Sequence, residues 1–183
     1  MTPGERKQLL DSYGNAPVIL RAALRSFPKQ MWRYRSAPGR WSIHEYVLYL
    51  ADSEAVEYIC CRRFVAEPRS PALTIDTSAW AEMLGYFHQN TREALRIITG
   101  LRRSTHRLLA TLRESLWHTS FDHSLHGKIN MEIWLEIQER RIPAQIDRMK
   151  ENYRGWLKLN PPSKSPSNRR PPKKAGPMSA GTC

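Results

Sequence analysis

The sequence lacks the long apolar runs that a membrane-spanning segment requires. No stretch approaches the roughly 18 uninterrupted apolar residues of a transmembrane helix, so we expect no membrane span. The first residues, MTPGERKQLLDSYG, carry charges where a secretory signal needs an apolar stretch. We therefore do not expect secretion.

Cysteine is also scarce. Cys60 and Cys61 are adjacent and Cys183 is the last residue, which is the spacing of neither a disulfide framework nor a zinc site. This pattern is typical of the reducing cytoplasm, where we expect the protein to lie. Cys60 could be a reactive thiol beside Arg62 and Arg63, but inert packing of at least one of the adjacent pair is the favoured interpretation.

Acidic residues are few relative to basic ones, 17 against 29, which gives a net charge of +12. Half of this excess lies from Leu157 onward, in a segment rich in proline, serine, lysine and arginine. Such a composition cannot bury enough apolar surface to fold. We predict a folded domain at residues 1–158 and a disordered tail at 159–183. The tail is interpreted as a solubilising extension, with a weak contact to nucleic acid or an anionic surface as the alternative.

A second basic segment interleaves cations with the aromatic residues Phe27, Trp32 and Tyr34. This combination suits single-stranded nucleic acid. The interpretation we favour is a solvated helix end whose aromatic side chains turn inward. The basic residues of the segment are Arg21, Arg25, Lys29, Arg33 and Arg35.

Apolar residues recur at helical spacing in four long stretches, and no stretch alternates as a strand would. Capping signals predict where helices begin: Thr2-Pro3, Ser42 with Glu45, and Asn130. A further cap, Asp76-Thr77-Ser78, precedes Trp80. The four predicted helices lie at about 3–27, 42–67, 84–112 and 130–149, the third divided near a glycine.

Two local features modify this pattern. Residues 14–17 (GNAP) predict an interruption of the first helix, and Pro143 predicts a kink in the fourth. A polar loop is expected before the fourth helix, with solvated rather than metal-binding side chains at His118, Asp122, His123 and His126. His44, in a first helical turn, is expected to be exposed. The four helical stretches and the connections between them predict an all-α fold, an up-down four-helix bundle.

One segment carries a more specific signal. Residues 38–54, PGRWSIHEYVLYLADSE, resemble the second-helix signature of the DinB/YfiT-like bundles. Supporting similarities occur in the expected order at residues 75–81 (IDTSAWA), 94–112 and 126–128 (HGK), and at 144–146 (AQI). The resemblance spans about residues 5–156 and implies a four-helix bundle of DinB/YfiT type.

The resemblance also implies a metal site, because family members typically bind nickel or zinc through three histidines. The corresponding positions here are Tyr49, Gln138 and Ile142, none of which is a good ligand for these metals. No histidine occurs after His126. We therefore expect no metal and no cofactor, and a pocket at the former metal site lined by Tyr49, Gln138, Ile142 and Glu54. Asp52 and Glu54 lie on different sides of the helix and are not expected to act as a carboxylate pair.

Three functional hypotheses follow. The favoured one is a metal-free, non-catalytic bundle that binds a small ligand or a partner in its cleft, as a homodimer. The alternative is a divergent thiol transferase or hydrolase of the family in which Tyr49 serves as acid or hydrogen-bond donor. The second alternative is a nucleic-acid-associated protein that uses its basic tail.

Overall fold

The computed structural model describes residues 1–69, 73, 75–123 and 126–161; the predicted tail thus lies almost wholly outside the described residues. Four long helices carry the fold. The elements are α1 (Pro3–Arg25), η1 (Lys29–Met31), α2 (Ile43–Ala66), α3 (Thr77–Met83), η2 (Tyr86–His88), α4 (Thr91–Ala110), α5 (Glu114–Trp117), β1 (Phe121–His123), β2 (Gly127–Ile129) and α6 (Met131–Leu159).

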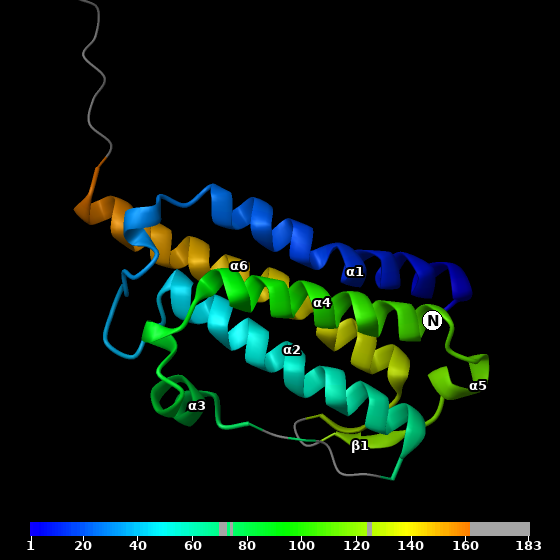
Figure 1. Cartoon of the computed structure of the whole chain (residues 1–183). Coiled ribbons are helices and arrows are strands. Elements are labelled where there is room, and N and C mark those ends of the chain that lie inside the picture. Colours follow the sequence, from blue (N-terminus) through cyan, green and yellow to red (C-terminus); the bar gives the residue numbers. More distant parts are fainter. Residues whose placement is uncertain (70–72, 74, 124–125, 162–183) are drawn as a thin grey trace, which may run out of the picture.

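The predicted all-α four-helix bundle is confirmed (Figure 1). Helices α1 and α2 each pack against both α4 and α6, so the two consecutive helices α1 and α2 lie diagonally across the bundle. The chain directions do not simply alternate. Figure 1 shows that α2 and α4 run the same way, because the connection that contains α3 returns along the bundle before α4 begins. Among the described residues, no helix is long and apolar enough to cross a membrane.

The predicted helix starts are also confirmed. Thr2 and Ser42 each form a complete capping box, with Glu5 and Glu45 respectively, and the side chain of Asn130 accepts a hydrogen bond from the amide of Ile133. The predicted interruption near Pro17 is wrong. Helix α1 is continuous through this buried proline, because Tyr13, Ala16, Leu20 and Leu24 pack one face of the helix onto the core and offset the lost hydrogen bond. Helix α6 likewise continues through Pro143.

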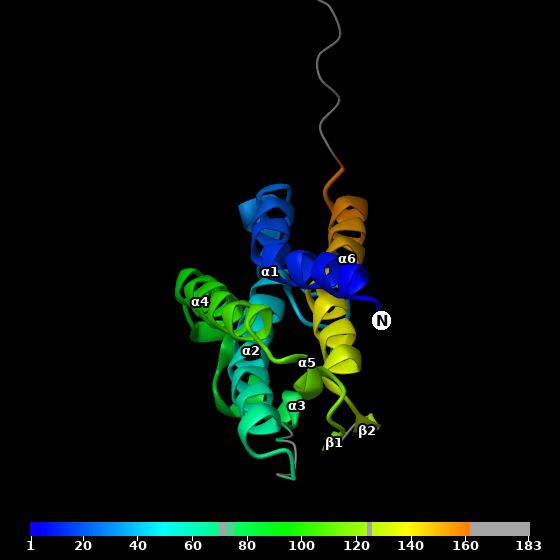
Figure 2. The ribbon, with the colours of Figure 1, turned by 90° about the vertical axis from the view of Figure 1, so that its right-hand side faces the viewer.

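The segment expected to be a polar loop contains an antiparallel hairpin instead. β1 pairs with β2 in a register that places Phe121 opposite Ile129, and both side chains are buried. The ring of Phe121 stacks on Phe64 of α2 at a centroid distance of 3.6 Å. Figure 2 shows the hairpin at the end of the bundle where α6 begins. His123 is consequently buried, whereas His118, Asp122 and His126 are exposed as expected.

His44 corrects a second expectation, because it is buried rather than exposed. One ring nitrogen lies 2.9 Å from the carbonyl of Tyr86 and the other 2.7 Å from the hydroxyl of Thr91. Burial lowers the pKa of His44. The imidazole therefore joins α2 to η2 and to the start of α4, contacts that the periodicity of one helix cannot reveal.

Both members of the adjacent cysteine pair are buried in the core. Burial raises the pKa of Cys60, and it raises the pKa of Cys61 to about 12. A thiol with a raised pKa carries little thiolate at neutral pH and is a poor nucleophile. The predicted burial is confirmed for both cysteines, and low reactivity of the pair stays a prediction.

Asn152 of α6 fixes the connection between α1 and α2. Its side chain accepts a hydrogen bond from the amide of Ser36 at 2.8 Å and donates to the carbonyls of Tyr34 and Trp41 at 2.7 and 3.4 Å. Asn152 is buried, so truncation would leave these backbone groups without partners.

Replacement Asn152→Ala should therefore lower the free energy of unfolding by about 2 kcal/mol, because unpaired buried polar groups are costly. Urea denaturation followed by circular dichroism measures this change. Asn15→Ala, at an exposed position inside α1, is the control and should not lower the free energy of unfolding. Equal stability of the two variants would contradict the assigned role of Asn152.

Candidate functional site

The three residues that the resemblance places at metal-ligand positions lie on two helices and differ in burial. Tyr49 is on α2 and half-buried, whereas Gln138 and Ile142 are on α6 and fully buried. The fourth predicted pocket residue, Glu54, is also buried, one and a half turns after Tyr49. The site therefore lies within the core between α2 and α6, with Tyr49 as its most exposed member.

A charged pair crosses this part of the core. The carboxylate of Glu54 accepts two hydrogen bonds from the guanidinium of Arg102 on α4. Nε of Arg102 lies 2.9 Å from one carboxylate oxygen, and Nη2 contacts the other. Arg102 has no exposed surface. Its remaining nitrogen, Nη1, donates to the backbone carbonyl of Gln138 at 3.3 Å, and the guanidinium lies 4.0 Å from the ring centre of Tyr13. One arginine thus joins α1, α2, α4 and α6.

A second pair lies beside the first. Arg141 of α6 donates to Glu57 of α2 at 2.6 Å, and the indole nitrogen of Trp134 donates to the other oxygen of that carboxylate at 2.9 Å. Burial alone would lower the pKa of Arg141, but the charge of Glu57 raises it above its ordinary value, with smaller contributions from Tyr49 and Glu54. We call Glu54, Glu57, Arg102 and Arg141 the buried ion-pair cluster.

The cluster is electrically balanced and already hydrogen-bonded. Burial raises the pKa of the Glu54 carboxyl, and the charge and hydrogen bonds of Arg102 oppose that rise. Because each carboxylate has a guanidinium partner, neither is free to bind another cation. A divalent ion placed here would also face two buried positive charges.

The residues present therefore do not fit a divalent metal. Tyr49, Gln138 and Ile142 supply no imidazole, and Glu54 is held by Arg102. In the part of the chain that the structure describes, no group of three histidine, cysteine, aspartate or glutamate side chains could hold a metal ion.

Gln138 stands out among the buried polar side chains. Within the described residues, neither its Nε2 nor its Oε1 has a hydrogen-bond partner, although the side chain is only 1% exposed. A buried amide without partners costs a few kcal/mol, and such groups are rare in folded proteins. The amide lies next to the carbonyl that accepts from Arg102, at the position where the resemblance places a metal ligand.

Aromatic rings pack together around Tyr49, at one end of the site. The ring of Trp41 lies 5.1 Å from that of Tyr49 and also contacts Tyr46 and Tyr86. The hydroxyl of Tyr86 donates to Asp52 at 2.6 Å, so Asp52 and Glu54 have different partners and do not form a carboxylate pair, as predicted.

Sequence reasoning missed the arginines of the cluster. Arg102 occupies a core position of α4, in line with the buried residues Ala94, Ile98, Thr105 and Leu109. An arginine within the apolar stripe of an amphipathic helix is a usable signal, because a buried charge requires a partner. Arg141 offers no comparable signal, since its neighbour Arg140 is exposed and the two are indistinguishable in sequence.

Comparison with known proteins identifies the class to which this helical bundle belongs. The model of the DinB superfamily matches residues 15–139, more than half of the sequence. The chain belongs to the DinB superfamily, as the resemblance implied.

Among solved structures, the chain is similar to YfiT from Bacillus subtilis, described as a probable metal-dependent hydrolase with an unusual four-helix bundle topology. The TM-score is 0.77 at 20% identity, over 84% of this chain and 89% of that one. At this identity the likeness shows the fold. No curated protein matches the sequence.

Removing Arg102 should be strongly destabilising. Arg102→Met leaves Glu54 buried without a counter-charge, which costs about 3–5 kcal/mol, whereas Arg102→Met combined with Glu54→Leu should recover most of that loss. Urea denaturation of the two single variants and the double variant measures the coupling. Arg103→Met, at the exposed neighbouring position, is the control. Additive effects of the two single changes would contradict the pairing.

Proposed function

We propose that the protein is a metal-independent, non-catalytic member of its superfamily that binds a small polar molecule at the former metal site. The unpaired amide of Gln138 carries this proposal, because a buried donor and acceptor without protein partners are paired when a ligand supplies the complementary groups. The site would be lined by Tyr49, Gln138, Ile142 and Glu54.

The neighbouring charges indicate what kind of molecule would fit. The ion-pair cluster contributes two positive and two negative charges, so the site has no net charge to attract an ion. The Gln138 amide offers an NH₂ donor group and a carbonyl acceptor, and the Tyr49 hydroxyl can also both donate and accept. A compact neutral molecule with both a donor and an acceptor, such as an amide or an alcohol, satisfies these groups.

Gln138→Leu tests the proposal because it keeps the approximate volume and removes the amide. We expect the variant to be more stable than the ligand-free native protein by about 1–3 kcal/mol, since two unpaired polar atoms leave the core. Native mass spectrometry should at the same time show that a small molecule bound to the purified native protein is absent from the variant. Gln8→Leu, at an exposed position of α1, is the control and should change neither property.

Loss of stability in Gln138→Leu, with no bound molecule in the native protein, would contradict the proposal. That outcome would mean that the Gln138 amide contributes to folding stability and does not bind a ligand.

An enzymatic role is the second candidate, favoured by the description of YfiT as a probable metal-dependent hydrolase. In this chain Tyr49 would act as acid or hydrogen-bond donor without metal. Turnover of thiol-conjugation or amide substrates that is abolished by Tyr49→Phe and unaffected by chelators would establish this role in place of simple binding.

We also propose that the protein acts as a homodimer in the cytoplasm. Several large apolar side chains are exposed, among them Met83 at 82% and Val18 at 63%, and contact with a second copy would remove such side chains from water. Light scattering coupled to size-exclusion chromatography measures the mass, and a monomer of 21.3 kDa at micromolar concentration would contradict the dimer.

A further inference from the structure

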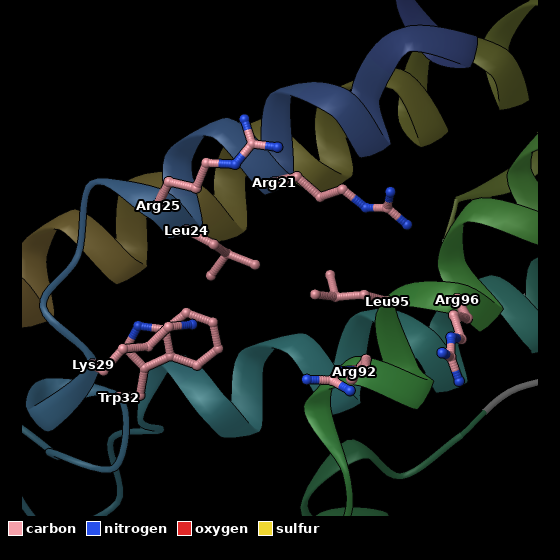
Figure 3. Close-up of a pocket in the computed structure, with 8 residues that line it drawn as sticks. All are labelled: Arg21, Leu24, Arg25, Lys29, Trp32, Arg92, Leu95 and Arg96. Carbon is pink, nitrogen blue, oxygen red and sulfur yellow. The ribbon is translucent and has the colours of Figure 1, made fainter.

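A basic hollow lies on the surface between α1, η1 and the beginning of α4, away from the former metal site (Figure 3). Its volume is about 490 Å³, within the range of sites that hold small organic ligands. The residues that line this basic hollow are Arg21, Leu24, Arg25, Lys29, Trp32, Arg92, Leu95 and Arg96.

Five of these eight side chains are cationic and none is acidic. Arg21 donates to the hydroxyl of Thr99 at 2.9 Å, and the ammonium of Lys29 lies 3.4 Å from the ring centre of Trp32. Arg25, Arg92 and Arg96 form no ion pair with any carboxylate of the described residues. Positive charges gathered in this way repel one another, and an anion between them removes the repulsion.

Other exposed arginines, such as Arg103 and Arg107, also form no ion pair with a carboxylate of the described residues. The buried Arg6 and Arg102 and the half-buried Arg141 all have carboxylate partners. The three unpaired arginines of the hollow come from two helices, α1 and α4, that are brought together only by folding. What distinguishes the hollow is that folding places cations from both helices around one depression.

The floor of the hollow is apolar. Leu24 is buried, and Leu95 and Trp32 are half-buried and pack against the main core. Figure 3 shows Leu24, Leu95 and the ring of Trp32 between the surrounding cations. A ligand that fills the hollow must combine anionic groups with an apolar part, because a simple ion would leave this surface in contact with water.

The hollow continues past the first turn of α4. A neighbouring depression of about 710 Å³ shares Lys29, Trp32, Arg92 and Leu95 and reaches Thr91. The N-terminal end of a helix carries a partial positive charge, which adds to the attraction of the side chains for an anion. More than one anionic group can therefore be held in a row from Arg25 to Arg92.

We propose that the basic hollow binds a small organic diphosphate or triphosphate. The phosphates would lie against Arg25, Arg92 and Arg96, and the apolar or aromatic group of the ligand would lie on Leu24, Trp32 and Leu95. Phosphate is favoured over a single carboxylate because planar guanidinium groups donate to phosphate oxygens in pairs and several cations converge. The site is separate from the one proposed at Gln138.

An extended nucleic-acid strand fits this surface less well. The basic residues that would prolong the track are engaged elsewhere, since Arg35 pairs with Glu45 and Arg33 donates to the carbonyl of Phe87 at 2.8 Å. Phe27 is buried and offers no ring for a base to stack on. The cations available for binding surround a hollow of limited length.

Isothermal titration of the full chain at low salt tests this proposal with four probes: adenosine diphosphate, geranyl diphosphate, inorganic pyrophosphate and adenosine. We expect the two organic diphosphates to bind more tightly than pyrophosphate, which lacks the apolar part, and adenosine not to bind measurably. Added salt should weaken the binding of every phosphate probe.

Matched charge-reversal variants locate the site. Arg92→Glu and Arg96→Glu should each weaken diphosphate binding by about tenfold or more, because each removes a charge-assisted contact and adds a repulsive charge. Arg107→Glu, on an exposed turn of the same helix and outside the hollow, makes the same change in net charge and should weaken binding less than about twofold. All three positions are exposed, so the fold should be retained, which circular dichroism checks.

Two outcomes would overturn the proposal. Equal weakening by Arg107→Glu and Arg92→Glu would mean that binding follows net charge alone. Tighter binding of a single-stranded DNA 20-mer than of either organic diphosphate, also lost in Arg92→Glu, would make this surface a nucleic-acid contact.

Discussion

The pairing of Arg102 with Glu54 is the interaction on which the rest of the core depends. A buried carboxylate requires a positive partner, and here the partner is a side chain from a third helix of the bundle. The same guanidinium reaches the backbone of α6 and the ring of Tyr13 on α1. The packing of all four long helices is therefore linked to the charge state of one residue on α2.

This constraint bears on the former metal site. In this chain two guanidinium groups, from Arg102 and Arg141, provide the positive charge between α2 and α6. With Glu54 and Glu57 paired, the neutral amide of Gln138 is left without a hydrogen-bond partner among the described residues. A core arranged in this way favours a neutral guest, whereas the unpaired arginines on the surface between α1 and α4 favour an anion. The two proposed sites differ because their charges differ.

Much of the fold could be predicted because its signals are local. The capping boxes at Thr2 and Ser42 and the cap at Asn130 give the starts of three helices, and the residues from Pro38 to Glu54 indicate the family. The rest depends on contacts between distant segments. The hairpin forms because the ring of Phe121 stacks on that of Phe64, and His44 is buried because η2 covers it. Helices α2 and α4 run parallel because a long connection joins them. The path of this connection depends on contacts that no single segment of the sequence reveals.

The proposal that this protein works without a bound metal ion is tested most directly by elemental analysis of the native protein purified without chelators. The account predicts nickel, zinc and manganese well below one ion per chain, unchanged after dialysis against each metal and unchanged in Tyr49→Phe. One ion per chain that resists dialysis and is lost in Tyr49→Phe would contradict the account.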